Sequence, residues 1–89
     1  MLFRSGRRHT IERLRGLLSL LRSELGESLP DRQTRIGYKF THQQLACAIG
    51  TTRVTVSRMM AQFQSKGYLK LDRHRHLILE NSYFSNIGN

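Results

Sequence analysis

Hydroxyl and guanidinium groups are concentrated near the middle of the chain, in residues 51–58, TTRVTVSR. Arg53 and Arg58 are five residues apart, and a guanidinium can donate two parallel hydrogen bonds to guanine O6 and N7. Threonine hydroxyls at the positive end of a helix can donate to phosphate oxygens. These residue types and spacings therefore favour hydrogen bonding to a nucleic acid.

A helical wheel separates two faces of this segment. The predicted buried stripe consists of Val56, Met59, Met60 and Phe63. The opposite face is small and weakly polar apart from one arginine, and consists of Val54, Ser57, Arg58 and Ala61. A helix exposed only to water would normally carry lysine and glutamate there, whereas small residues let a helix lie deep in the major groove of DNA.

The predicted base contacts are Arg53, Val54, Ser57 and Arg58, with a thymine methyl as the target of Val54. Two separate alternatives stay open. Val54 could be a spacer that contacts no base, and Arg53 could bind a phosphate instead of a base. The predicted phosphate contacts are Thr41, His42, Thr51, Thr52, Thr55, Arg73 and Arg75. One of the threonines at 51–55 must also cap a helix, so at most two of those hydroxyls remain for phosphate.

Two helices joined by a tight turn must position these groups. Thr41 with Gln44 three residues later predicts a capping box at the start of the first helix. Gly50 suits a turn with positive φ, and Ala46 is small enough for close contact between the helices. The second helix is expected to run from about Thr51 to Lys66, before Gly67.

The flanking segments complete a predicted winged helix-turn-helix, mainly α with a small antiparallel sheet. An apolar stripe predicts a helix over residues 10–25, capped by Thr10 and ended by Gly26, with Leu20 off the stripe and free to face a partner. The other expectations are a loop at 26–35, a short strand at 36–40 and a hairpin at 68–80, the wing. The tip of the wing, residues 72–76, is expected beside the DNA backbone or minor groove; a solvated turn is the alternative. The domain is thus expected at 10–80, between a basic extension at 1–9, which is either frayed or continuous with the first helix, and a loose tail at 81–89.

The charge balance agrees with a polyanion partner. The chain has 15 Lys and Arg against 6 Asp and Glu, a formal net charge of +9 on 89 residues. A ribosomal-type or merely soluble basic protein is the plain alternative. Cys47 is the only cysteine, so an internal disulfide is impossible and a reducing cytosol fits. We expect no membrane span and no secretory signal.

Catalysis and metal binding have little support. His74 and His76 are two apart and are expected on one side of a strand, and His42 and His9 could be imagined joining them. Zinc sites, however, usually include cysteine thiolates at set spacings. We therefore expect no metal and no cofactor, and regard Cys47 as an inert helix residue rather than a redox sensor. Acidic residues are scattered and no glycine-rich phosphate loop occurs, so we expect no enzyme.

The run KFTHQQLACAIGTTRVTVSRMMAQFQSKGYLKL, followed by HLIL, resembles the C-terminal DNA-binding domain of the cyclic-AMP receptor / fumarate-nitrate regulator superfamily. The likeness covers residues 10–80, and TTRVTVSRMM is most similar to the global nitrogen regulator of cyanobacteria. It implies that Arg53 and Arg58 are the arginine pair of the recognition helix. The family commonly has a glutamate that reads cytosine where this chain has Val54. Sites in the nitrogen-regulator branch resemble inverted repeats of GTA and TAC half-sites.

Members of that superfamily also carry an effector-binding β-barrel and a long dimerisation helix, which these 89 residues do not resemble. We therefore expect a DNA-binding transcription regulator domain without its effector domain, a homodimer only if other segments or DNA supply the interface. RNA polymerase is a further candidate partner, and the expected location is the cytoplasm, at the nucleoid. A winged-helix module for protein interaction or RNA binding is the alternative function.

Overall fold

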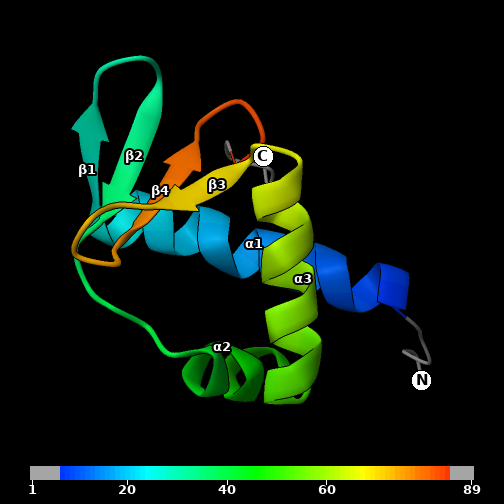
Figure 1. Cartoon of the computed structure of the whole chain (residues 1–89). Helices are drawn as coiled ribbons and strands as arrows, with labels where there is room; N and C mark the ends of the chain where they lie inside the picture. Colours follow the sequence, from blue (N-terminus) through cyan, green and yellow to red (C-terminus); the bar gives the residue numbers. More distant parts are fainter. Residues whose placement is uncertain (1–6, 85–89) are drawn as a thin grey trace.

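The computed structural model of the chain describes residues 7–84. Their elements follow the order α1 (Arg7–Leu25), β1 (Gly26–Leu29), β2 (Gln33–Ile36), α2 (His42–Ile49), α3 (Arg53–Ser65), β3 (Leu69–Leu71) and β4 (Leu77–Glu80), as Figure 1 shows. Residues 1–6 of the expected basic extension and 85–89 of the expected tail lie outside the described residues. Among residues 7–84, no helix is long and apolar enough to cross a membrane.

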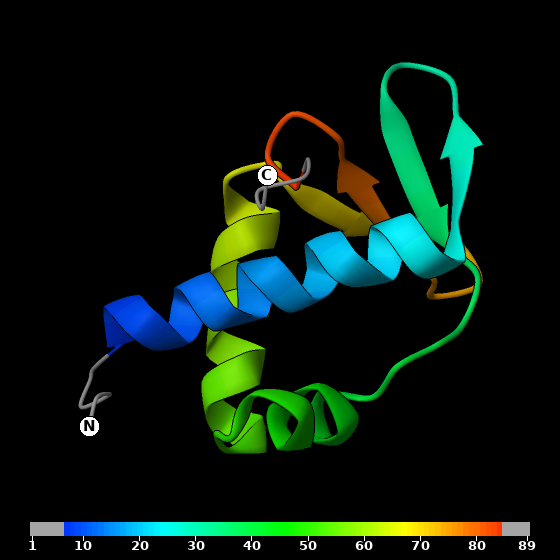
Figure 2. The same cartoon turned by 180° about the vertical axis from the view of Figure 1, so that it is seen from behind.

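Helix α1 lies across α3, as the view from behind shows (Figure 2). The predicted apolar stripe faces the core, and two of its members, Leu14 and Leu18, are fully buried. Its other members are Ile11, Leu17, Leu21 and Leu25. The prediction that Thr10 caps this helix is wrong, because α1 begins at Arg7 and Thr10 lies inside it. Arginine is a good helix former, so the residues just before Thr10 can extend the helix.

A hairpin replaces the loop that we expected at 26–35. Strand β1 pairs antiparallel with β2, from Gly26 opposite Ile36 to Leu29 opposite Gln33. The chain passes tightly from α1 into the hairpin, since a Cβ added to Gly26 would overlap both the Thr34 side chain and the carbonyl of Arg22. The strand expected at 36–40 is also wrong: β2 ends at Ile36, and the chain then bends towards α2.

The four strands form one antiparallel sheet in the order β1-β2-β4-β3. Strands β3 and β4 pair as the predicted wing, from Leu69 opposite Leu79 to Leu71 opposite Leu77. Strand β4 also pairs with β2, so Thr34 lies opposite Leu79. The wing therefore belongs to the same sheet as the hairpin next to α1, and the predicted fold class, helices with a small antiparallel sheet, is confirmed.

Aromatic residues close the core at the C-terminal end of the described chain. Phe63 of α3 contacts Phe84 and Tyr83, with ring centroids 5.6 and 5.5 Å apart, and the Tyr83 ring stacks on that of Tyr68 at 3.7 Å. Phe84 has no exposed surface. The loose tail expected from residue 81 is therefore wrong for its first four residues, because the energy of burying these rings outweighs the polar sequence around them.

Arginines of α1 fix this end of the chain. Arg15 Nε donates to the Tyr83 carbonyl at 3.2 Å, and Arg22 Nε donates to the Phe84 carbonyl at 2.9 Å. The guanidinium of Arg15 also lies 4.6 Å from the centre of the Tyr83 ring. Burial raises the pKa of Tyr83. These two arginines thus contribute to internal contacts as well as to the net charge.

Candidate nucleic-acid interface

The start of α2 is fixed by the predicted capping box. The Thr41 hydroxyl accepts from the Gln44 backbone N–H at 3.0 Å, and the Gln44 side chain accepts from the Thr41 N–H at 2.8 Å. The helix ends at Ile49 and is capped by Gly50, whose φ of 75° lies in the left-handed region that glycine adopts at little cost. Arg13 of α1 donates to the carbonyl of Ile49, which would otherwise lack a partner at the helix end.

Thr52 caps α3, which answers the question of which threonine is used. Its hydroxyl accepts from the Thr55 N–H at 3.2 Å and donates to the Thr55 hydroxyl at 3.0 Å. Helix α3 therefore begins at Arg53, and Arg53 lies in its first turn. Thr51 and Thr55 are half-buried, and the Thr55 hydroxyl keeps a proton that could go to a phosphate.

The two faces of α3 agree with the helical wheel. Its inward face packs into the core through Val56, Met59, Met60 and Phe63. On its outward face Val54 is 59% exposed, and Arg53, Arg58 and Ala61 are also exposed. The outward face of the helix thus carries an exposed apolar side chain together with two exposed arginines.

A groove separates α3 from the wing. Arg53 and Ser57 line its α3 wall, and Leu71 and Arg75 line its wing wall. The third wall is the segment between β2 and α2, with Tyr38 53% exposed beside Phe40. Sequence reasoning missed Tyr38 and its neighbour Lys39, because a bend has no periodic pattern that would point to them. Arg58 lies on the other flank of α3, where a second hollow also contains Thr51 and Thr55.

His42 and Ser57 are in direct contact, although the sequence assigned one to phosphate and the other to a base. His42 Nδ1 lies 2.7 Å from Ser57 Oγ, which ties the first residue of α2 to the middle of α3. If Nδ1 carries the proton, Ser57 accepts from His42 and its own hydroxyl proton is free for DNA. If Nδ1 is bare, Ser57 donates to it and offers only lone pairs. The contact therefore governs what Ser57 presents to a base.

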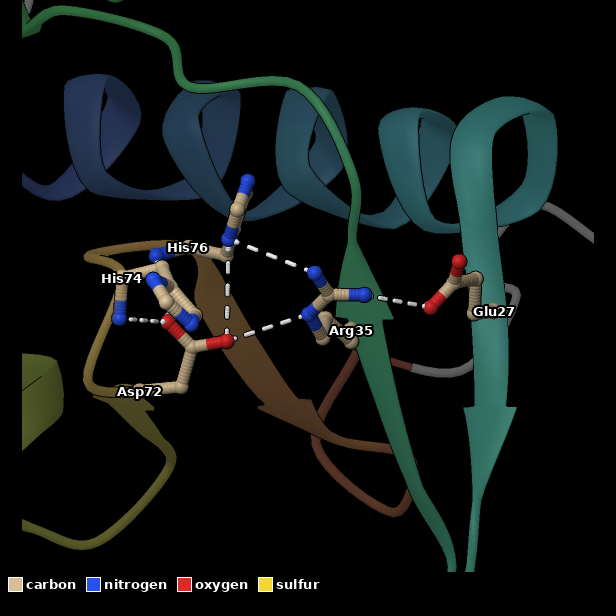
Figure 3. A network of polar contacts seen from close by, with 5 residues as sticks. All are labelled: Glu27, Arg35, Asp72, His74 and His76. Carbon is tan, nitrogen blue, oxygen red and sulfur yellow. Dashed lines mark hydrogen bonds and ion pairs between the residues drawn. The ribbon is translucent and has the colours of Figure 1, made fainter.

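The tip of the wing, residues 72–76, is ordered around Asp72 (Figure 3). Its Oδ1 accepts from the N–H groups of His74 and His76 at 2.8 and 2.9 Å, and its Oδ2 accepts from Arg35 Nε at 3.0 Å. These bonds lower the pKa of Asp72 from 3.8 to about 2, with the His76 N–H as the largest cause. Arg73, His74 and Arg75 are exposed around this carboxylate.

The histidines do not form the pair expected on one strand face. Residues 72–76 form a turn between β3 and β4, and the rings of His74 and His76 are 6.4 Å apart at 62°. Within residues 7–84, no group of three or more histidine, cysteine or acidic side chains could hold a metal ion. Cys47 is exposed on α2, with the Gln43 amide 3.5 Å from its sulfur.

The fold and the outward face of α3 define a winged helix-turn-helix domain. The chain belongs to the Crp-like helix-turn-helix domain family, whose model matches residues 7–82. Domains of this family are the DNA-binding parts of transcription factors and are not enzymes. The predicted membership of the cyclic-AMP receptor / fumarate-nitrate regulator superfamily is thereby confirmed.

Solved transcription factors contain the same fold. The CO-dependent transcription factor CooA from Carboxydothermus hydrogenoformans, in its imidazole-bound form, has a TM-score of 0.74 and 25% identity, over 89% of this chain and 38% of CooA. CprK complexed with OCPA has a TM-score of 0.73 and 22% identity, over 88% of this chain and 38% of CprK, and shows likeness of fold alone. The chain therefore spans little more than a third of either protein. No curated protein matches it in sequence.

Proposed function

We propose that this domain reads duplex DNA by placing α3 in the major groove, as part of a regulator of transcription. The observation that carries the proposal is the outward face of α3, where the exposed Val54 lies between Arg53 and Arg58. In the major groove of DNA, Arg58 and Arg53 would contact base edges and Val54 would contact a thymine methyl. Ser57 would offer a base either a donor or an acceptor, depending on its hydrogen bond with His42.

Phosphate contacts would hold α3 in register. Thr51 and Thr55 lie near the positive N-terminal end of α3, while Thr41 and His42 lie at that of α2. The Thr52 hydroxyl already caps α3, so we rank it below its two neighbours as a phosphate donor. Arg73 and Arg75 of the wing tip would reach the backbone beside the major groove.

The recognition sequence TTRVTVSRMM favours membership of the nitrogen-regulator branch of the superfamily, and with it half-sites of the GTA and TAC type. Each copy of the domain would bind one half-site, so two copies on one face of B-DNA would lie about 34 Å apart. A homodimer would need an interface from other segments or from DNA. RNA polymerase as a second partner, and a cytoplasmic location at the nucleoid, belong to this proposal.

Selection from random pools tests the proposal directly. The purified 89-residue chain would be immobilised and offered random duplex DNA and, separately, random single-stranded RNA. We expect the DNA pool to converge on one short motif related to GTA or TAC, and the RNA pool to show no common sequence. An affinity that is the same for the selected and the scrambled duplex would contradict base reading by α3. Convergence of the RNA pool alone would favour the RNA-binding alternative.

A further inference from the structure

An acidic side chain begins the basic loop at the tip of the wing, residues 72–76. Asp72 begins the wing tip, RHRH follows it, and its carboxylate uses both oxygens in hydrogen bonds. An acid in this place lowers the attraction of the wing for a polyanion. Its presence therefore needs a compensating contribution to the shape of the loop.

The carboxylate fixes that shape from within. The backbone N–H of Asp72 donates to the His76 carbonyl at 3.0 Å, and the Arg75 N–H donates to the Asp72 carbonyl at 2.9 Å. Together with the two N–H groups on Oδ1, these bonds close the loop at Arg75, whose φ is 67°. Residues other than glycine rarely adopt this left-handed backbone conformation unless the surrounding structure holds them there.

Arg35 attaches the loop to the rest of the sheet. It belongs to β2, which is two strands away from β3, and its guanidinium bridges Asp72 of the wing tip to Glu27 of β1 (Figure 3). His76 Nδ1 completes the cluster, 3.4 Å from Arg35 Nη2 and 3.6 Å from Asp72 Oδ2. These contacts join the wing tip to β2 and β1 as well as to its own two strands.

We propose that Asp72 and Arg35 are positioning residues for DNA binding, which hold the wing tip in the one arrangement that lets Arg73 and Arg75 reach the phosphate backbone. The inference rests on the proposed function. A loop that is already ordered loses less conformational freedom on binding, so its cations bind more tightly than those of a loose loop with the same charge. Asp72 thus strengthens binding although its own charge opposes it.

The direction in which one substitution changes the affinity for DNA separates this proposal from simple electrostatics. Asp72→Ala raises the net charge by one, and charge alone would strengthen DNA binding. We expect binding to weaken by about threefold to tenfold instead, the range for one or two side chains that must be ordered on binding. Glu24→Ala is the matched control, because it makes the same change of charge at an exposed position of α1 and should leave affinity equal or slightly higher.

A more conservative substitution of Asp72 and a double-mutant cycle with the wing arginines test how Asp72 acts. Asp72→Asn keeps an oxygen for the two backbone N–H groups but loses the ion pair with Arg35, so its affinity should lie between those of wild type and Asp72→Ala. In a background of Arg73→Ala with Arg75→Ala, Asp72→Ala should cause no further weakening. Affinities would be measured by fluorescence anisotropy on the selected duplex, with melting curves of each variant to check folding.

The possible results distinguish failure of the positioning role from failure of the proposed function. If Asp72→Ala strengthens binding as Glu24→Ala does, or weakens it equally without the two wing arginines, the positioning role is overturned. If instead the wild-type chain shows no preference for any duplex, the proposed function itself fails. Should Asp72→Ala not fold, Asp72→Asn takes its place in the cycle with the same expected signs.

Discussion

Arg58 and Arg73 carry the same charge in different surroundings. We therefore expect that replacing each by alanine changes DNA binding in a different way. Arg58 lies on the outward part of α3, whereas Arg73 lies in the wing tip. Arg58→Ala should reduce the preference for the selected duplex over a scrambled one by roughly 1–3 kcal/mol, the usual contribution of a base-reading arginine. Arg73→Ala should weaken binding to both duplexes about equally.

Anisotropy titrations with both duplexes measure this difference. Arg32→Gln serves as a control for net charge, because Arg32 is exposed in the turn of the β1–β2 hairpin, away from α3. Equal ratios of selected to scrambled affinity for the Arg58 and Arg73 variants would show that Arg58 binds phosphate rather than a base.

Asp72 also predicts how stability changes with pH. Its pKa is lowered to about 2 in the folded protein, so the ionised form stabilises the fold above its unfolded pKa of 3.8. This contribution is lost as the pH falls from about 4 towards 2. Urea unfolding followed by circular dichroism should therefore show a steeper decline over that range for wild type than for Asp72→Asn. If the free energy of unfolding depends on pH in the same way for the two proteins, the hydrogen bonds of the carboxylate do not stabilise the fold.

Local patterns in the sequence predicted several residue roles well. The capping box at Thr41, the left-handed Gly50 and the buried stripe of α3 each depend on neighbours within one or two helical turns. The bond between His42 and Ser57 and the bridge made by Arg35 join residues 15 and 37 positions apart. A single sequence has no signal for such pairs, because the partners meet only when the tertiary fold brings them together.

At the scale of the elements, the turn between α2 and α3 should depend on its glycine for conformation rather than for space. A Cβ at Gly50 would have its nearest neighbour, Arg13 Nη2, at 3.8 Å, which is ordinary contact, but φ is +75°. Gly50→Ala should therefore lower the free energy of unfolding by roughly 1–2 kcal/mol. Gly16→Ala is the control of opposite sign, because Gly16 lies within α1 with open space around it, and it should stabilise by about 0.5–1 kcal/mol.

Urea unfolding monitored by far-ultraviolet circular dichroism would give both values. A Gly50→Ala protein as stable as wild type would mean that the turn relaxes to an ordinary conformation.

The elements themselves differed in how far they could be predicted. The wing has alternating apolar and polar residues before its basic tip and the apolar run Leu77–Leu79 after it, and its hairpin was predicted. The β1–β2 hairpin was not, because its four-residue strands are short and β1 is almost wholly exposed, so no alternation is visible in the sequence. Its place in the sheet comes from pairing with β4, a partner more than forty residues away along the chain.

The charge of the whole molecule should make binding strongly dependent on salt. If each domain neutralises on the order of five phosphates, the logarithm of the affinity should fall against the logarithm of salt concentration with a slope of about −4.5. Removing Arg73 and Arg75 together should make the slope shallower by about 1.8, at roughly 0.9 per phosphate contact. Anisotropy titrations from low to high salt measure both slopes, and an affinity that stays constant would rule out a phosphate-dominated interface.

The aromatic cluster at the end of the described chain also bears on where this domain can be cut. The family match stops at residue 82, yet Phe84 is completely buried and Arg22 bonds to its carbonyl. A gene fragment stopped after Ser82 would leave Phe63 beside a void, and loss of a buried phenylalanine costs roughly 3–5 kcal/mol. Small domains have only about 5–15 kcal/mol in total, so this fragment should melt far below the full chain in calorimetry. The last two aromatic residues therefore belong to the folding unit, although a boundary drawn from sequence similarity leaves them out.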